Sequence, residues 1–335
     1  MKTKIKKFFI SFGKMAVLPV GMYLLFLIIT LIQGKTTFFS YDTIMIILRR
    51  TAYIAIVAWA FSITVQAGRW DFAIGAQVLL SAIIGCNLAK LWGLGSIGML
   101  ALCILTGVVL GAIYGIVYVL LRVPARVLSL GILLVYEAMS TIVFDSKGAY
   151  LSGDGATVLG TEPWLFVICL CLMVIYHIVM YKTKFGFDLR STGNGQEIAL
   201  NIGISEDKNA FLGYTFAGLF LGAAGAVYIA MNGIIEVTQN MSSTSIFFNC
   251  IMPVTMGVYL SRFGKASFSI IFSSMAMSIL IYGLITTGIS TQMQNVFQGV
   301  FIILFMTFTE NSSRFTAFLN RRKMRRAFEN GVLNV

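Results

Sequence analysis

The chain has 335 residues, of which 58% are hydrophobic and 11% are charged, and its formal net charge at pH 7 is +12. An ordinary soluble fold is excluded, because soluble domains carry about 25% charged residues and could not hide this much apolar surface from water. The positive charge indicates the cytoplasmic loops of a membrane protein rather than a nucleic-acid partner, since such loops are enriched in lysine and arginine.

Ten apolar segments are long enough to cross a bilayer, which takes about 20 residues in a helix. The sequence thus predicts an all-α fold, a polytopic transmembrane helical bundle. It divides into a basic N-terminal segment (1–15), a transmembrane domain (16–310) and a basic tail (311–335). We expect the first apolar run to be a retained span, because it is longer than a signal-peptide core and no small-x-small cleavage site follows it. The expected spans are 16–33, 43–66, 73–91, 96–121, 127–144, 163–181, 208–231, 246–261, 266–287 and 293–310.

Charge placement predicts the orientation of this bundle. If the N-terminus lies inside and the spans alternate, most lysines and arginines fall in cytoplasmic segments, including the tail. An odd number of spans would place the basic tail outside, against the positive-inside rule. Both termini are therefore expected in the cytoplasm. Arg49 and Arg50, near the start of the second span, are expected at the interface or beyond it, because charge at mid-bilayer is costly.

Two loops stand out by their length and polarity. The outer loop at 145–162 is rich in glycine and acidic residues, a composition typical of an exposed, adaptable surface. The inner loop at 182–207 is the longest cytoplasmic connection, and glycines bracket a run from Gln196 to Ile202 that fits one or two helical turns. This run is either a docking element for a cytoplasmic partner or part of a solvated linker, and its pattern does not choose between them.

Small residues recur at four-residue spacing in two of the expected spans. Such residues let membrane helices approach one another closely. We expect helix-packing faces at Gly107, Gly111 and Gly115 and at Gly218 and Gly222.

Signals for catalysis are nearly absent. The one histidine, His177, lies inside an apolar run and is more typical of helix packing. The five cysteines lack metal-ligand spacing, so no metal site is expected. A phosphate-binding loop is missing too, because Gly34-Lys35-Thr36 has the required ending but Ile29 stands where the first glycine must be. The chain is therefore predicted to be no enzyme, to bind no cofactor itself and not to hydrolyse ATP alone.

Two acidic residues lie where charge is costly. Asp71 follows a break between hydrophobic runs, where it either lines a cavity at a broken helix or caps the helix that starts near Phe72. Glu137 lies deeper within a span. It either forms part of a functional site or pairs with a tyrosine, serine or arginine of a neighbouring helix.

Three segments follow one another in order: Gly68 to Ala76 (GRWDFAIGA), Arg122 to Gly131 (RVPARVLSLG) and Phe185 to Gly225. They are similar, in turn, to the Gly-Gly-Ile-Asp-Leu-Ser-Val-Gly-Ser, Pro-Pro-Phe-Ile-Val-Thr-Leu-Gly and Gly-Gly-Asn-Pro-Glu-Ala-Ala-x-x-x-Gly-Ile segments of the ribose-type permeases of ABC importers. Order and spacing match over roughly residues 45–310, so the chain resembles this family. The matching residues of the third segment are Gly193, Glu197, Ala199, Gly203, Ile204, Gly218 and Gly225.

The resemblance implies a permease subunit of an ABC importer in the cell membrane of a prokaryote. Such a subunit pairs with a second permease subunit, identical or different. It binds a cytoplasmic ABC ATPase, which uses the ATP, and an extracytoplasmic solute-binding protein. The stretch from Gly193 to Ile204 would be the coupling loop that meets the ATPase. Separately from the resemblance, we expect Asp71, Glu137 and Gln66 to belong to the substrate pathway.

Several positions depart from the family pattern. Asn194 and Gly195 reverse the usual Gly-Asn order, and Glu137 stands where the family often has arginine. Because Glu137 and Asp71 would change the charge near the pathway, the resemblance does not fix the solute. We expect a small polar solute, a monosaccharide first and a nucleoside or related metabolite second. The alternative class, a self-sufficient secondary transporter or channel, would need a chain of intramembrane ionisable groups and activity without an ATPase.

Overall fold

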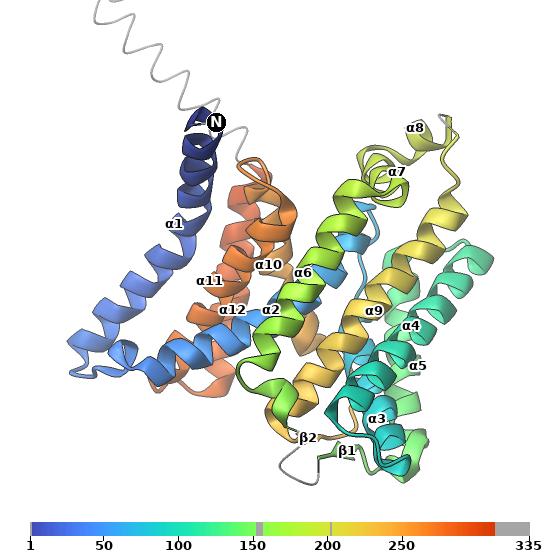
Figure 1. Ribbon diagram of the computed structural model, residues 1–335, viewed down its shortest axis with the longest axis horizontal. Coiled ribbons are helices and arrows are strands. Elements are labelled where there is room, and N and C mark those ends of the chain that lie inside the picture. The colour runs from blue at the N-terminus through green and yellow to red at the C-terminus, as the bar shows by residue number, and fades with distance from the viewer. Residues whose placement is uncertain (1, 152–156, 202, 312–335) are drawn as a thin grey trace, which may run out of the picture.

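The computed structural model describes residues 2–151, 157–201 and 203–311, and nearly all of it is helical (Figure 1). The expected basic tail lies almost wholly outside these residues, as does the middle of the outer loop. The helices are α1 (Lys2–Ile32), α2 (Tyr41–Gln66), α3 (Ile74–Leu91), α4 (Ser96–Leu121), α5 (Ala125–Ile142), α6 (Trp164–Lys182), α7 (Lys184–Asn194), α8 (Gln196–Asn201), α9 (Glu206–Asn232), α10 (Thr244–Leu260), α11 (Ala266–Thr286) and α12 (Thr291–Glu310). Short 3-10 turns are η1 (Thr37–Phe39), η2 (Val143–Ser146) and η3 (Val158–Gly160), and two strands are β1 (Ala149–Tyr150) and β2 (Ile234–Ile235).

Each of the ten expected spans contains an apolar helix. Within the described residues, eight helices are long and apolar enough to cross a bilayer, namely α1 to α6, α9 and α11. The other two, α10 and α12, have shorter apolar stretches, Thr244–Leu260 and Val296–Thr307. The predicted all-α polytopic bundle is therefore confirmed. Because α1 begins at Lys2, the basic N-terminal segment continues into the first span as one helix.

The bundle keeps apolar side chains on its outer surface as well as in its core. Trp59 and Phe220 are completely buried, whereas Leu120 on α4 and Leu170 on α6 are 73% and 59% exposed. Water would penalise such a surface, but lipid tails are as apolar as leucine and cover it without cost. This distribution is the one expected of a multi-pass membrane protein.

Helices α4 and α9 form the most extensive helix pair of the bundle. Their glycine stripes face each other: a Cβ atom on Gly107 would lie 2.6 Å from the Cα of Gly222 and would also collide with the Gly218 carbonyl. A Cβ on Gly111 would collide with the Tyr214 carbonyl, one turn further along. The structure thus brings the two expected packing faces together, with the backbones in direct contact.

The two ends of the bundle differ in structure. Helices α7 and α8 lie at the same end as the start of α1, whereas β1 and β2 lie at the opposite end (Figure 1). The strands pair antiparallel, with Ala149 opposite Ile235, and the Asn87 side chain donates a hydrogen bond to the Gly148 carbonyl. This small ribbon was not predicted, because two residues per strand are too few to show an alternating pattern.

Candidate functional site

The loop at 182–207 folds into two helices, α7 and α8. The short run expected at Gln196 to Ile202 corresponds to α8, whereas α7 was missed because Gly186 and Gly193 suggested a linker. Gly186 instead allows close packing, since a Cβ there would lie 2.6 Å from the Cα of Met180. The signal for α7 was Thr183, whose hydroxyl accepts a hydrogen bond from the Gly186 N–H at 3.2 Å as a helix N-cap.

Helices α7 and α8 are seated on the rest of the bundle through small residues. Gly193 packs so closely against the Gln66 carbonyl at the end of α2 that no Cβ fits there. Ala199 is buried, and Gly203 has a φ of +83°, which a glycine adopts without strain. Ile204 is half-buried, and the Glu197 side chain lies outside the described ones. The predicted coupling loop therefore rests directly on the α2–α3 connection.

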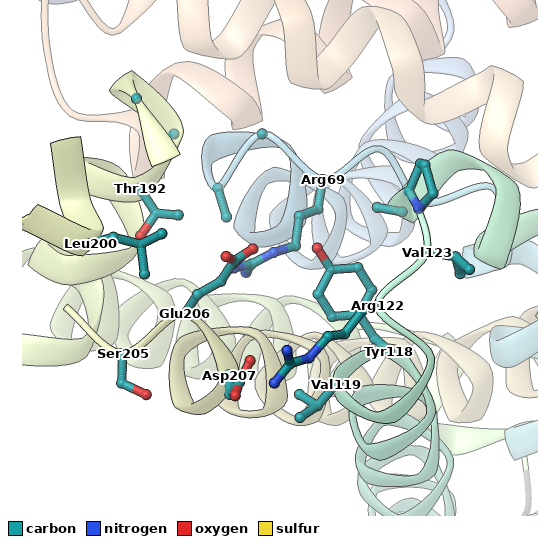
Figure 2. A pocket seen from close by; sticks show the side chains of 16 residues that line it. Arg69, Tyr118, Val119, Arg122, Val123, Thr192, Leu200, Ser205, Glu206 and Asp207 are labelled. Atoms are coloured by element: carbon teal, nitrogen blue, oxygen red, sulfur yellow. Dashed lines mark ion pairs between the residues drawn. The ribbon is translucent and has the colours of Figure 1, made fainter. Parts of the chain in front are cut away.

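A cavity of about 870 Å³ opens beside these helices, and we call it the α7–α8 pocket (Figure 2). Three connections that are far apart in the sequence form its walls: α2–α3, α4–α5 and the stretch from α7 to the start of α9. All three are expected on the cytoplasmic side, because they follow the second, fourth and sixth expected spans. The side chains labelled in Figure 2 are Arg69, Tyr118, Val119, Arg122, Val123, Thr192, Leu200, Ser205, Glu206 and Asp207.

Arg69 is the central charged residue of the α7–α8 pocket. It is only 5% exposed, and its Nη2 lies 3.9 Å from Oε1 of Glu206 on α9. Its Nη1 donates to Oδ1 of Asn209 at 3.5 Å, and its guanidinium carbon lies 5.5 Å from the centre of the Tyr118 ring on α4. One buried cation therefore connects the α2–α3 connection to both α4 and α9.

Asp71 contacts the turn before α3 and the neighbouring helix α4, but it does not cap α3 through a side-chain hydrogen bond. Its Oδ1 accepts hydrogen bonds from the Ala73 N–H at 2.9 Å, just before α3 begins, and from the Tyr114 hydroxyl at 3.2 Å. Its Oδ2 is buried and has no hydrogen-bond partner within the described residues. Asp71 does not line the α7–α8 pocket. Its place in a substrate pathway therefore stays a prediction.

Glu137 is bound to backbone N–H groups rather than to a side chain of a neighbouring helix. Its two carboxylate oxygens accept from the N–H groups of Met241, at 2.8 Å, and Ser243, at 2.9 Å. Gly75 packs against the same segment, because a Cβ there would collide with the Ser243 carbonyl. Gln66 donates to the Tyr176 hydroxyl at 3.0 Å. Neither Glu137 nor Gln66 lines the α7–α8 pocket, and their role in a substrate pathway also stays a prediction.

His177 on α6 has two polar contacts with residues at the start of α11 and just before it. Its Nδ1 lies 3.0 Å from the Ser267 hydroxyl and its Nε2 lies 3.1 Å from Nζ of Lys265. Within the part of the chain that the structure describes, no three His, Cys, Asp or Glu side chains gather as a metal site would require.

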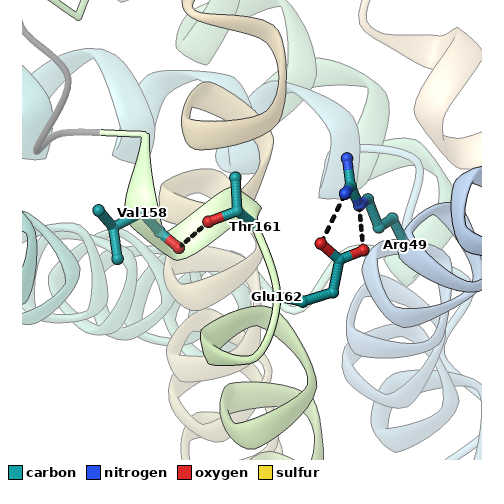
Figure 3. Close-up of polar contacts among 4 residues, drawn as sticks. All are labelled: Arg49, Val158, Thr161 and Glu162. Atoms are coloured by element: carbon teal, nitrogen blue, oxygen red, sulfur yellow. Dashed lines mark hydrogen bonds and ion pairs between the residues drawn. The ribbon is translucent and has the colours of Figure 1, made fainter.

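Arg49 and Glu162 form a two-armed ion pair near the end of the bundle that carries β1 and β2 (Figure 3). Nε and Nη2 of Arg49 each donate to one oxygen of Glu162, both at 2.6 Å. This geometry matches the planar guanidinium fork to a carboxylate. The pair ties the first half of α2 to the segment that leads into α6, and the hydrogen bond from Arg49 holds the pKa of Glu162 below its usual range.

Glu162→Gln is expected to lower the melting temperature slightly at pH 7, because the two side chains are 36% and 30% exposed and ion pairs open to water stabilise proteins weakly. The stabilisation is present above the unfolded-state pKa of the carboxyl and is lost as the pH falls through the lowered folded-state value. The difference in melting temperature between wild type and variant should therefore shrink when the pH is reduced from 7 to about 3.5, below the usual glutamate pKa. If the difference in melting temperature is the same at both pH values, the Arg49–Glu162 pair does not stabilise the fold as assigned.

The chain is similar to a family of transport permeases and to individual import permeases. The family model described as branched-chain amino acid transport system/permease component matches residues 43–306. A probable branched-chain amino acid transport permease protein of Methanocaldococcus jannaschii is 25% identical over 53% of this chain and 62% of its own length. An autoinducer 2 import system permease protein of Photorhabdus luminescens is 24% identical over 59% and 61%, respectively. The galactose/methyl galactoside import permease protein of Escherichia coli is 23% identical over 89% and 94%.

The alignments with the first two relatives therefore span less than two thirds of those proteins. The three motif segments at 68–76, 122–131 and 185–225 all lie inside the region that the family model matches. No solved structure shows a significant match.

Proposed function

Because the chain belongs to the branched-chain amino acid transport system/permease component family, as its sequence resemblance predicted, we propose that it is the membrane-spanning permease subunit of an ABC importer. It pairs with a second permease subunit and acts in the cell membrane of a prokaryote. A cytoplasmic ABC ATPase binds and hydrolyses the ATP, and an extracytoplasmic binding protein delivers the solute. The end with α7 and α8 faces the cytoplasm.

The seating of α7 and α8 is the observation that carries this proposal. The two helices contact the bundle at Gly193, where the backbone of α7 touches the end of α2. The α2–α3 connection continues from that contact to Arg69, which reaches Glu206 at the start of α9 and Tyr118 on α4. A displacement of α7 and α8 by a bound ATPase would therefore reach three transmembrane helices through packed, buried groups.

Transport follows from a difference in binding between two states of the permease. The ATPase shifts the equilibrium between inward-facing and outward-facing states only as far as it binds one of them more tightly. The α7–α8 pocket supplies the surface for that difference, because its walls come from three separate connections between helices. The chain itself has no phosphate-binding loop, so the energy must come from the partner.

The solute is proposed to be small and polar. The names of the relatives refer to galactose and methyl galactoside, to autoinducer 2 and to branched-chain amino acids. A monosaccharide is the first expectation for this chain, and a nucleoside or related metabolite is the second.

Leu200→Asp tests the proposed docking surface. Leu200 lies on α8 and is 51% exposed, so a partner that docks on α8 can contact its side chain directly. We expect the substitution to reduce the amount of ATPase recovered with the tagged chain by at least about tenfold, without changing the amount of chain in the membrane. Glu197→Arg, on the same helix, is expected to act in the same direction.

The matched control is Ile234→Asp. Ile234 lies on β2 at the opposite end of the bundle and is 63% exposed, so it receives the same change in a similarly open position. ATPase recovery should stay at the wild-type level in this variant. Equal recovery from Leu200→Asp and wild type would rule out α8 as the docking element.

A further inference from the structure

A second cavity, of about 430 Å³, lies between α2, α9 and α10, and we call it the Arg50 pocket. It is formed by the first half of α2, the last turns of α9 and the start of α10. Since α9 leads directly into β2, the pocket lies toward the end of the bundle opposite α7 and α8 (Figure 1). Its polar lining residues are Arg49, Arg50, Tyr53, Tyr228, Asn232, Ser245 and Asn249.

The two arginines of this pocket differ in their partners. Arg49 is neutralised by its two-armed pair with Glu162. Arg50 is partly buried, and within the described residues it forms neither a hydrogen bond nor an ion pair. No acidic side chain lines the pocket. The cavity therefore contains one uncompensated positive charge.

Further hydrogen-bonding groups of the pocket are also unused. The Tyr53 hydroxyl is buried and has no hydrogen-bond partner within the described residues. The side-chain amide of Asn249 is half-buried and likewise has none in the part of the chain described. Tyr53 packs against Tyr228, another residue of the pocket lining, with 5.4 Å between ring centroids. A buried polar group without a partner destabilises the fold, so such groups gathered in one cavity indicate a missing ligand.

The chemistry of the missing ligand follows from these groups. An arginine within a membrane span is costly without a counter-charge, and a guanidinium binds carboxylate and phosphate oxygens through two parallel hydrogen bonds. The tyrosine hydroxyl and the asparagine amide can donate to or accept from hydroxyl groups of the same molecule. The volume lies in the range of pockets for small molecules.

We propose that the Arg50 pocket binds a small hydroxylated solute that carries a carboxylate or phosphate group, with this group on Arg50 and the hydroxyl groups toward Tyr53 and Asn249. The proposal rests on the proposed function, in which the pocket lies on the solute's route from the outer side. It changes the expected substrate class from a neutral monosaccharide to an acidic solute of similar size. Gln66, Asp71 and Glu137 do not line this pocket either.

The test uses the purified full chain in detergent and two probes that differ only at C6, where glucuronate has a carboxylate and glucose has a hydroxymethyl group. Affinities are measured by thermal shift. Glucuronate should bind with an affinity at least about tenfold higher than that of glucose, and Arg50→Gln should lower the glucuronate affinity by at least about tenfold. Arg50→Lys should restore only part of it, because lysine lacks the two-armed geometry.

The control is Lys90→Gln, because Lys90 is a cation outside the pocket that lies over the Tyr150 ring at 3.4 Å. Its affinities should equal those of wild type. If Arg50→Gln does not fold, Tyr53→Phe provides the same test, since it removes only the unpartnered hydroxyl and should weaken glucuronate binding. Glucuronate affinities equal to those of glucose, or unaffected by the pocket variants, would overturn the proposal.

An anionic lipid headgroup offers the same phosphate chemistry, so a second arm separates the two sources. Glucuronate binding is repeated in nanodiscs made of phosphatidylcholine alone and of phosphatidylcholine with phosphatidylglycerol. Similar glucuronate affinities in the two kinds of nanodisc support a solute site. If phosphatidylglycerol lowers the glucuronate affinity of wild type, and Arg50→Gln abolishes this competition, the pocket binds a lipid headgroup and the proposal is overturned. The amount of ATPase recovered with the chain is measured for wild type and for the same variants. If wild type recovers no ATPase, the proposed function is contradicted, whereas the pocket assignment is not.

Discussion

Gly107→Leu is expected to prevent the recovery of stable, folded protein. A side chain at this position would be forced into the backbone of α9, where the Cα of Gly222 lies 2.6 Å from the first added carbon and the Gly218 carbonyl is closer still. Backbone atoms cannot move aside as the end of a flexible side chain can, so α4 and α9 would have to separate. Such overpacking should lower the free energy of unfolding by at least about 3 kcal/mol. The measurement is the melting temperature and the monodisperse yield in detergent.

Gly131→Leu is the matched control for Gly107→Leu. Gly131 also lies inside a membrane helix, α5, but it is exposed and a Cβ there would have no atom within 4 Å. The same change in size and helix propensity should therefore leave the yield near wild type or improve it. Similar losses in both variants would show that the effect comes from any leucine in a span and not from the α4–α9 contact.

Glu137→Ala is expected to have the second-largest effect. Its carboxylate holds two backbone N–H groups, those of Met241 and Ser243, in the segment that leads into α10. The substitution would leave both donors without this partner, the Ser243 N–H in a buried position, and it should lower the free energy of unfolding by on the order of 3 kcal/mol. Glu137→Gln retains one acceptor oxygen and should lose less. Melting temperature and transport are measured on the same preparations.

The control for Glu137 is Glu236→Ala, because Glu236 is exposed. This variant should match wild type in stability. If Glu137→Gln loses expression and transport to the same extent, the carboxylate acts by holding the segment at Met241–Ser243. If transport falls while the melting temperature is unchanged, Glu137 instead contacts the solute, and its assignment as a structural residue is wrong.

The spans could be predicted from the sequence because the bilayer imposes a length on each apolar helix. The glycine stripes on α4 and α9 were also visible, since four-residue spacing alone places residues on one helix face. Helix α7 was missed because Gly186 suggested a break, although it provides a close contact with α6. Only the three-dimensional packing shows which of these two roles a glycine has.

The contacts of the site residues were less predictable than the helices. The free-energy cost of placing the Glu137 carboxylate in a span was apparent from the sequence. Its backbone partners, the N–H groups of Met241 and Ser243, are 104 and 106 positions away and carry no sequence signal. The same holds for Arg49 and Glu162, which are 113 positions apart. Both arginines had been expected at the interface on the ground of cost alone. In the sequence alone the two arginines look alike, and only the ion pair with Glu162 in the structure distinguishes the neutralised Arg49 from the unpartnered Arg50.

The permease assignment is tested most directly by what the chain binds in its own membrane. The tagged full-length chain is purified from native membranes in mild detergent, and the proteins recovered with it are identified by mass spectrometry. We predict an ATPase subunit with a phosphate-binding loop, in an amount comparable to the chain and strongly reduced by Leu200→Asp. Recovery of intact chain without any ATPase, together with solute uptake that needs none, would contradict the assignment.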